Sequence, residues 1–440
     1  MKKLVIYLNY VRLAFFPLSY GIVGALMGST LNRVMIADIG FRAAWVGLFF
    51  AVPDLVAPIR VWLGYRSDGF PILGRRREPY IILGVIVTSL SVVLVTRLAT
   101  IGEVTNGLLI LTILLAFVVF GIGRNLAHNS WQALLADKFH GDSRPRAVTA
   151  FEVLTVVGLI LGAGVIGQML GEYDAAQLLS VAVGLATITF LMTLLAVILQ
   201  EPRTPTTEIA TEQARAMPFS KVFKEIVWAD KQVRLFFILI MFAFVGTLAQ
   251  DVFLEPYGGL VLGMDVGATT QLTVFWGLGL IIGMLLSGII LIKWLGYMRV
   301  LRIGLIANML VFIGIIVSGL GDNTALFRSL VLVMGFSTGL AGAGMLTIII
   351  NFTSYLRAGL LLGVWGVANQ LGRALGSLMG GGVVDIMQGV TDGNAFLSYA
   401  TVFALEVVML LVAFVLSYRL NLQETKAQNE ERQVLERVAA

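Results

Sequence analysis

Residues 75–97 read RRREPYIILGVIVTSLSVVLVTR, and this stretch decides the class of fold. Three arginines precede a run with no charged side chain between Glu78 and Arg97. A helix needs about 20 mostly apolar residues to cross a hydrocarbon core of about 30 Å. The stretch therefore predicts a membrane-spanning helix over 79–97 with a basic anchor at one end.

Similar apolar runs recur along the whole chain. Together they predict twelve spanning helices, over 11–32, 43–63, 79–97, 107–135, 147–168, 176–199, 234–253, 270–291, 299–318, 326–348, 358–382 and 396–418. The longest polar stretch between spans, 201–232, divides them into six plus six. We expect a six-helix bundle over 1–200, a linker over 201–232, a second six-helix bundle over 233–418, and a polar tail over 419–440.

The composition excludes a water-soluble protein. The 440 residues are 58% hydrophobic and 13% charged, whereas soluble domains carry roughly 25% charged residues. Forty-eight glycines suit membrane helices, which approach closely through small residues. With no Cys and two His, the chain offers no disulfide and no multi-histidine centre, so we expect no metal site.

Basic residues concentrate in alternate loops. One side holds Lys2, Lys3, Arg12, Arg66, Arg75–Arg77, Lys138, Arg144, Arg146, Arg203, Arg215, Lys221, Lys224, Lys231, Arg234, Lys293, Arg299, Arg302, Arg357, Arg419, Lys426, Arg432 and Arg437. The other side holds only Arg33, Arg42, Arg97 and Arg328, beside several acidic residues. The positive-inside rule then places both termini in the cytoplasm, which requires an even number of spans. The net charge of +5 follows from topology, and no nucleic-acid partner is expected.

Between the second and third predicted helices lies GYRSDGFPILGRRREPY, residues 64–80. This loop resembles the gating loop of major-facilitator transporters in its residues Gly64, Asp68, Gly74, Arg75, Arg76 and Arg77. The resemblance implies that Asp68 latches one state of two rocking halves. The alternative is that the arginines only anchor topology. A weaker copy, GIILIKWLGYMR at 288–299, favours duplicated halves.

Three further segments are more distinctive: LNRVMIADIG at 31–40, LLADKFHGDSRPRAV at 134–148 and QDVFLEPYGGLVLG at 250–263. Together with the gating loop they resemble the PucC family, a branch of the major facilitator superfamily that includes LhaA-type light-harvesting assembly factors. The residues that carry the resemblance are Asn32, Arg33, Asp251, Glu255, Pro256, Gly258 and Gly259.

The resemblance implies a major-facilitator fold and a role in assembling light-harvesting antenna complexes. It implies bacteriochlorophyll or chlorophyll as bound cargo. The implied partners are antenna α and β polypeptides, pigment-synthesis enzymes and membrane lipids. The implied location is the inner membrane, cytoplasmic or intracytoplasmic, of a photosynthetic cell.

Polar side chains within the predicted spans are costly in lipid and are therefore functional candidates: Arg60, Arg124, His128, Gln250, Asp251, Asn369, Gln370 and Arg373. The alternative is that they bridge helices or reach the interface. His128 could ligate the magnesium of a chlorin, and Trp131 one turn later could stack on the ring. Arg124 completes this candidate pigment site.

The sequence around Pro256 has a simpler interpretation as well. Pro-Tyr-Gly-Gly after a helix is ordinary turn chemistry, so we expect the seventh helix to end near 253 and a turn to follow. The carboxylates of Asp251 and Glu255 could bind a proton, a partner loop or a helix end. Arg33 and Asp38 can pair with each other or with this loop.

Three functions compete. The first is an assembly factor, and the second is a secondary transporter of a small solute or pigment precursor, which the fold alone would favour. Transporters need convergent polar groups at mid-membrane, and besides Glu152 and Asn308 we expect few, so an apolar interior favours the first. The third is an enzyme, but no paired Asp-rich clusters, Walker loop or catalytic triad is present, so no catalytic residues are expected.

Overall fold

The computed structural model describes residues 2–59, 63, 72–101, 106–139, 143–201, 231–248, 250–352 and 358–420. This part of the chain is helical apart from turns and an isolated bridge between Ile72 and Arg75. Nine of its helices are long and apolar enough to cross a membrane, and Ala43–Leu55 and Val153–Met169 are shorter apolar helices. The chain is an all-α, multi-pass membrane protein.

The described residues of the first half of the chain form six helical rods. The first rod combines α1 (Lys2–Ala25) with two π-helical segments, η1 (Leu26–Leu31) and η2 (Val34–Asp38). The others are α2 (Ala43–Leu55), α4 (Glu78–Ile101), α5 (Gly107–Lys138), α6 (Ser143–Met169) and α7 (Ala175–Val197).

The second half repeats this number among the described residues. Its first rod joins α10 (Lys231–Leu248) and α11 (Gln250–Leu260), and its second joins α12 (Val266–Leu286), η3 (Ser287–Leu291) and α13 (Ile292–Leu295). The remaining four are α14 (Tyr297–Leu320), α15 (Thr324–Phe352), α16 (Ala358–Val390) and α17 (Ala395–Arg419). Twelve rods in two sets of six agree with the sequence-based expectation.

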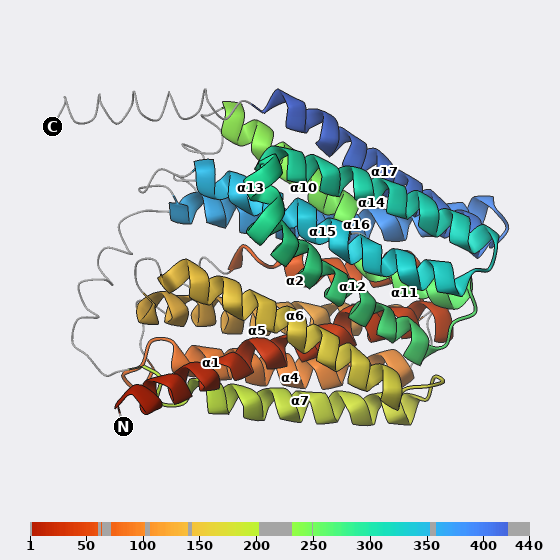
Figure 1. The fold of residues 1–440 in the computed structure, drawn as a ribbon. Coiled ribbons are helices and arrows are strands. Elements are labelled where there is room, and N and C mark those ends of the chain that lie inside the picture. The colour runs from red at the N-terminus through yellow and green to blue at the C-terminus, as the bar shows by residue number, and fades with distance from the viewer. Residues whose placement is uncertain are drawn as a thin grey trace.

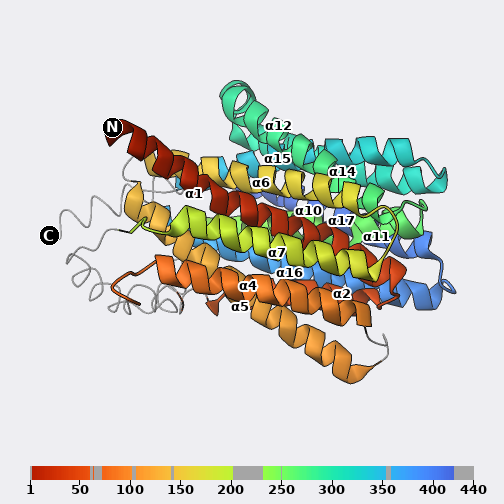
Figure 2. The ribbon, with the colours of Figure 1, turned by 90° about the horizontal axis from the view of Figure 1, so that it is seen from below.

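The two sets lie side by side as two bundles. Figure 1 shows α1, α4, α5, α6 and α7 in its lower part and α10, α14, α15, α16 and α17 in its upper part. The start of α1 and the end of α17 lie at the same end of the molecule, which we call the terminal end. The opposite end carries the turns at 39–42, 170–174, 261–265, 321–323 and 391–394, and we call it the distal end. Figure 2 shows the first bundle from its outer face.

Several expected boundaries were wrong. The first helix continues to Asp38 instead of ending at 32, and α2 stops at Leu55, before the turn at 56–58 that contains Pro58, instead of reaching 63. The second copy of the gating loop, 288–299, is helical up to Leu295 and breaks only at Gly296, which has a φ of +80°. The linker over 201–232 and the tail over 419–440 lie almost wholly outside the described residues, so the domain boundaries stay predictions.

Side-chain caps fix the helix starts at the distal end. Asp174 accepts the N–H groups of Ala176 and Gln177 at the start of α7, and Asp265 accepts that of Ala268 at the start of α12. Asn106, Asn323 and Asn394 do the same for α5, α15 and α17. Each cap satisfies backbone donors that a helix start leaves without partners. Part of the acidic character of the distal side therefore comes from helix capping.

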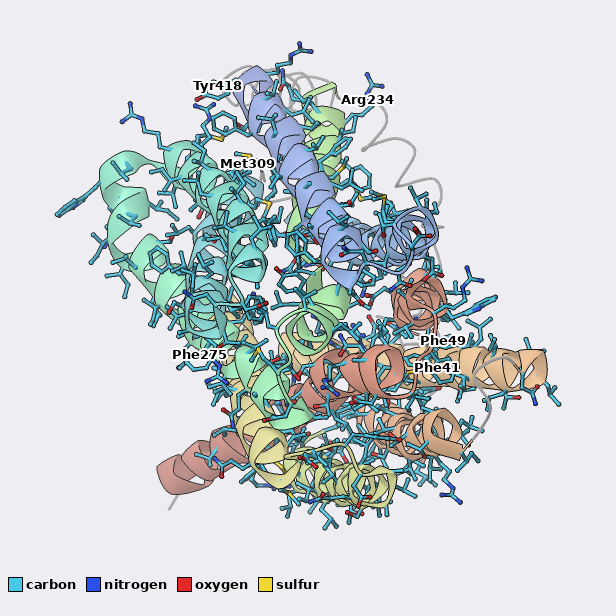
Figure 3. All side chains as sticks on the ribbon, turned by 90° about the vertical axis from the view of Figure 1, so that its right-hand side faces the viewer. Phe41, Phe49, Arg234, Phe275, Met309 and Tyr418 are labelled. Carbon is cyan, nitrogen blue, oxygen red and sulfur yellow. The ribbon has the colours of Figure 1, made fainter. Side chains whose placement is uncertain are left out.

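The bundles touch through glycines near the distal end. A Cβ atom on Gly47 of α2 would lie 2.3 Å from the carbonyl oxygen of Ser377 in α16. A Cβ atom on Gly267 of α12 would lie 2.5 Å from the carbonyl oxygen of Gly167 in α6. Only glycine permits backbones to approach this closely. Figure 3, viewed onto the distal end, shows Phe41 and Phe49 close together, and their ring centroids lie 6.4 Å apart.

Candidate functional site

The gating loop is described only from Ile72 onward. Gly64 and Asp68 lie outside the described residues, so the latch assigned to Asp68 stays a prediction. Gly74 has a φ of +73°, which glycine adopts without strain. Arg75 forms an ion pair with Glu78, the first residue of α4.

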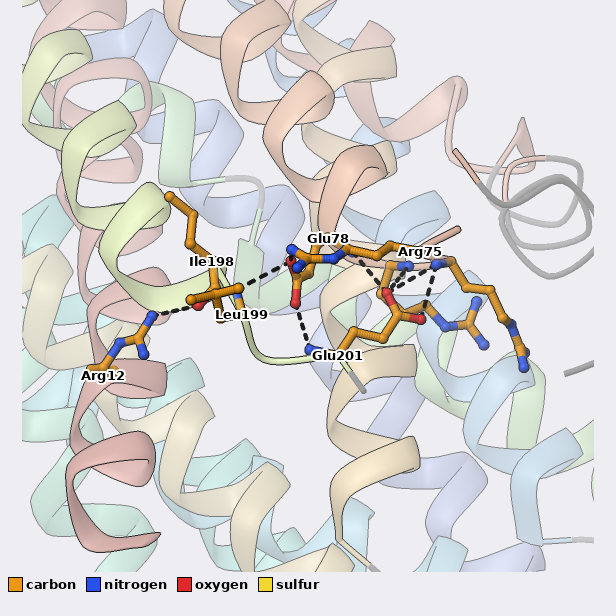
Figure 4. A network of polar contacts seen from close by, with 8 residues as sticks. Arg12, Arg75, Glu78, Ile198, Leu199 and Glu201 are labelled. Carbon is orange, nitrogen blue, oxygen red and sulfur yellow. Dashed lines mark hydrogen bonds and ion pairs between the residues drawn. The ribbon is translucent and has the colours of Figure 1, made fainter. Parts of the chain in front are cut away.

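Around Arg75–Arg77, two carboxylates hold the ends of α4 and α7 together at the terminal end (Figure 4). Glu201 accepts the backbone N–H groups of Arg76 and Arg77, each at 2.9 Å. In return, Glu78 accepts the N–H groups of Leu199 and Glu201. A carboxylate at a helix start satisfies free donors and complements the helix dipole. The described arginine loop thus braces the first bundle internally.

Two further cations belong to the same end. Arg12 donates to the carbonyl oxygens of Leu195 and Ile198, the latter at 2.5 Å, and so caps the end of α7 (Figure 4). Lys138 donates to Oε1 of Gln200 at 2.6 Å. Burial lowers the pKa of Lys138, and the nearby carboxylate of Glu78 opposes that shift.

At the distal end, Asn32 of the first bundle compensates for a hydrogen bond that Pro256 of the second bundle cannot make. Pro256 lies inside α11, so the expected Pro-Tyr-Gly-Gly turn is wrong: the helix runs to Leu260. Proline has no N–H, so the helix leaves the carbonyl oxygen of Val252 without its usual donor. Asn32 Nδ2 donates to that oxygen at 3.0 Å. A side chain from the first bundle therefore completes a helix of the second.

Arg33 strengthens the same contact. Its Nη2 donates to the carbonyl oxygen of Met264 at 3.0 Å, and its Nη1 pairs with Asp38. A Cβ atom on Gly259 would lie 3.2 Å from the guanidinium, so glycine at this position leaves room for the arginine. We call Asn32, Arg33, Val252, Pro256, Gly259 and Met264 the distal lock.

The other family-motif residues lie beside the lock. Glu255 is 5% exposed, and its carboxylate accepts hydrogen bonds at 3.4 Å from Asn32 Nδ2 and Thr273 Oγ1. The carbonyl oxygen of Gly258 accepts the N–H of Met264, and this hydrogen bond closes the end of α11. The backbone of Asp251 belongs to α11, whereas its side chain lies outside the described part of the structure.

A cavity of about 340 Å³ lies between the bundles, with the distal lock beside its floor. Helices of both halves line it. Its walls are mostly apolar and include six aromatic side chains: Phe16, Tyr20, Phe50, Phe117, Phe120 and Trp276. Ligand cavities in proteins commonly measure about 300–1,000 Å³ and combine apolar walls with a few polar groups. The cavity has the size and the composition of a small-molecule site.

One wall of the cavity carries a charged cluster. Asp54 of α2 is 2% exposed and lies 3.2 Å from Nη2 of Arg124 in α5 and 3.8 Å from Nε of Arg373 in α16. Arg124 Nε also donates to the hydroxyl of Tyr20 at 2.9 Å. Asp54 thus links one arginine from each bundle. Burial of a charge in this setting is tolerated because oppositely charged partners surround it.

This cluster overturns the expectation that few polar groups converge in the interior. Arg124 and Arg373 were candidates, but Asp54 was missed, although an acidic residue inside an apolar run is itself a signal. Asn308 lies elsewhere: it accepts a hydrogen bond from Ser337 at 2.8 Å and bridges α14 to α15. The side chain of Glu152 lies outside the described part of the structure.

The structure separates the three candidate pigment residues. Arg124 lines the main cavity, whereas His128 and Trp131 line a smaller neighbouring space of about 20 Å³. The ring of Trp131 stacks on Phe16 with centroids 4.6 Å apart, and His128 meets Tyr20 edge to face. Pigment ligation by His128 stays a prediction, and here the ring of Trp131 is already covered on one face.

Comparison with known sequences finds one family model over most of the chain. The model of the PUCC protein family matches residues 30–425. An uncharacterised protein from the puhA-bchM intergenic region of Rhodobacter capsulatus is 30% identical, with 91% of this chain and 87% of that protein covered. Protein PucC of the same species is 29% identical over 92% of this chain and 90% of its own length. A protein named bacteriochlorophyll synthase 44.5 kDa chain, also from Rhodobacter capsulatus, is 28% identical over 92% and 94%.

Two similar solved structures are those of transporters. A crystal structure of a point mutant of the nucleoside transporter NupG matches with a TM-score of 0.74 and 14% identity, covering 94% of this chain and 99% of that one. A D-xylose-proton symporter matches with a TM-score of 0.70 and 15% identity, covering 92% and 97%. At such low identity the likeness establishes the major-facilitator fold alone.

Proposed function

Because the chain belongs to the PUCC family and has the major-facilitator fold, we propose that it is a membrane assembly factor for photosynthetic light-harvesting antenna complexes. In this role it binds or delivers bacteriochlorophyll or chlorophyll, escorts antenna α and β polypeptides, or does both. The observation that carries the proposal is the mostly apolar cavity between the bundles, in a chain similar to PucC proteins over nine-tenths of its length.

The proposal places the protein in the inner membrane with both termini in the cytoplasm. The terminal end carries the arginine loop at 75–77 and Arg419, which supports this orientation. Pigment-synthesis enzymes are further proposed partners. Membrane lipids cover the exposed apolar side chains of the outer helices, such as Leu90 and Leu310.

We infer that the protein is not an enzyme. One relative bears the name of a bacteriochlorophyll synthase chain. Membrane enzymes that transfer prenyl groups hold the magnesium of a diphosphate substrate with paired Asp-rich clusters, and this sequence has none. The charged cluster around Asp54 combines one carboxylate with two guanidinium groups, which suits binding of a charged group better than magnesium coordination.

A second candidate function is secondary transport of a small solute or a pigment precursor. The observation that favours it is the convergence of Asp54, Arg124 and Arg373 from both bundles in one cavity. Transporters of this fold place their sites between the halves and open them alternately.

Deletion of the gene in its native host, followed by absorption spectroscopy of the membranes, tests the proposal. We expect loss of one antenna band, with normal total pigment in whole-cell extracts, because assembly fails while synthesis continues. Complementation with the intact gene should restore the band. Unchanged antenna bands would contradict the proposal, and accumulation of an esterification substrate would favour the enzyme.

A further inference from the structure

We propose that the cavity binds a largely apolar ligand that carries one anionic group, and that its pigment ligand is the free carboxylic acid form of the pigment, not the esterified one. The inference rests on the proposed pigment-handling function and adds the chemical class of the ligand. It follows from three features of the cavity: its arginines, its unpartnered polar atoms and its floor.

The arginines provide the anion-binding group. Arg124 has five N–H donors, two of which serve the Tyr20 hydroxyl and Asp54. Its side chain is 28% exposed and that of Arg373 is 39% exposed, although both line an interior cavity. Asp54, by contrast, is 2% exposed. The cavity therefore presents guanidinium groups to a ligand and hides the carboxylate behind them, and guanidinium groups bind carboxylates and phosphates by paired hydrogen bonds.

The walls indicate an apolar body with a few hydrogen-bonding groups. Apolar surface forms most of the lining, but four buried polar atoms of lining residues have no hydrogen-bond partner among the described residues: Ser29 Oγ, Thr193 Oγ1, Gln250 Oε1 and Trp276 Nε1. Buried polar atoms nearly always have a partner. Carbonyl and other polar substituents on a flat, mostly apolar ring system would supply partners for both the donors and the acceptors.

The floor limits the ligand to a single anionic end. The carboxyl group of Glu255 lies beside the distal lock and lines the cavity. Along the first helix, Asn32, which contacts Glu255, follows Tyr20, which contacts Arg124, by twelve residues, or roughly 18 Å at 1.5 Å per residue. A second negative group at the floor would face a carboxyl group. A carboxylate at the arginine end and an apolar body below it satisfy both ends of the cavity.

This arrangement distinguishes two forms of one pigment. The acid form carries a propionate carboxylate, whereas esterification with a long alcohol makes the same group neutral. A carboxylate enters an apolar cavity only when a charged partner compensates for its lost hydration. Arg124 and Arg373 supply that partner to the acid, while the ester gains nothing comparable from them.

Equilibrium binding to the purified, full-length protein in mild detergent tests the inference. Bacteriochlorophyllide and its methyl ester are the probes, because they differ by one methyl group and one charge. We expect the acid to bind about tenfold or more tightly than the ester, as for a hydrogen-bonded charge. Arg124→Gln and Arg373→Gln should each remove most of this preference.

The matched control is Arg42→Gln, because Arg42 also pairs with an aspartate, Asp385, but lies outside the cavity with its side chain 70% exposed. It should keep the full preference. Since Arg124→Gln leaves Asp54 buried without that partner, the triple variant Asp54→Asn with Arg124→Gln and Arg373→Gln removes all three charges of the cluster and should also lose the preference. Thermal unfolding of each variant verifies that it is folded.

Equal binding of acid and ester, or a preference that survives the arginine substitutions, would overturn the inference. So would competition by phosphatidylglycerol as strong as that of unlabelled acid, which would identify a lipid phosphate as the ligand. None of these results alters the antenna bands of the deletion strain, so failure of the inference and failure of the proposed function remain distinguishable.

Discussion

Asn32 supplies the hydrogen-bond donor that Pro256 removes from its own helix. Proline inside a membrane helix frees a carbonyl oxygen that lipid cannot satisfy, and such a site persists only where another group donates to it. Asn32 is fully buried, and its amide donates to the freed oxygen of Val252. The hydrogen bond therefore joins two short motifs that lie far apart in the sequence.

A double-mutant cycle tests this pairing. Asn32→Leu should lower the free energy of unfolding by about 1–3 kcal/mol, because the carbonyl of Val252 loses its donor. In the Pro256→Ala background the restored backbone N–H should satisfy that carbonyl, and the cost of Asn32→Leu should fall. Thermal unfolding in detergent measures both. Asn308→Leu, which removes a buried asparagine between α14 and α15, should cost the same in either background; a cost of Asn32→Leu that is likewise independent of Pro256 would contradict the pairing.

For these residues, contacts between sequence neighbours can be predicted from the sequence, whereas contacts between distant segments cannot. Pro-Tyr-Gly-Gly predicts a turn because local sequence cannot reveal Asn32, a donor that lies 220 residues away along the chain from Val252. Arg33 and Asp38 lie close enough in sequence for their pairing to be proposed, and it is confirmed. Asp54 was overlooked because its compensating arginines come from α5 and α16, and only the fold brings them together.

At the scale of whole elements, lipid makes helices predictable and leaves their ends uncertain. The hydrocarbon core demands about 20 apolar residues per span, so the twelve helices follow from composition along the chain. Helix ends depend on caps from distant residues. Glu201, for example, accepts the N–H groups of Arg76 and Arg77 at the start of α4, a contact between positions 124 or more residues apart.

We expect the reciprocal caps of α4 and α7 to act as one unit. Glu201→Gln and Glu78→Gln should each lower the free energy of unfolding by about 0.5–2 kcal/mol, the usual cost of losing a helix cap. Together they should cost less than the sum, since each single change already loosens the same junction.

Denaturant or thermal unfolding of the four proteins in detergent measures this coupling. Glu172→Gln provides the control, because Glu172 is exposed in the turn at 170–174 and should change stability by less than about 0.5 kcal/mol. Strict additivity of the two cap variants would indicate independent contacts.

At the scale of the whole molecule, the arrangement of the ends fixes a topology that can be measured. Leu73 is 86% exposed at the terminal end, and Glu172 is exposed at the distal end. The chain has no cysteine, so Leu73→Cys and Glu172→Cys each introduce a unique thiol. In intact cells a membrane-impermeant maleimide should label Glu172→Cys, and Leu73→Cys only after permeabilisation. The reverse pattern would invert the proposed orientation, and labelling of both in intact cells would exclude a spanning arrangement between these turns.

Because the distal lock holds the two bundles together at the distal end, we expect a ligand to enter the cavity from the terminal end or from the membrane. The hydroxyl oxygens of Thr30 in η1 and Thr270 in α12 lie 3.2 Å apart across the two bundles, beside the lock. The variant Thr30→Cys with Thr270→Cys should therefore form a disulfide on mild oxidation, seen as altered gel mobility that reductant reverses. Either cysteine alone should show no such change.

The cross-linked protein should bind the pigment acid with an affinity within about twofold of that of the reduced form. The reason is that the cavity is formed while the two bundles are in contact at the distal end, and the disulfide keeps them in contact. Binding that disappears on oxidation and returns on reduction would mean that the ligand enters only after the bundles separate at the distal end. That result would contradict access from the terminal end or from the membrane. It would favour a transporter cycle, because alternating access requires the distal contact to open.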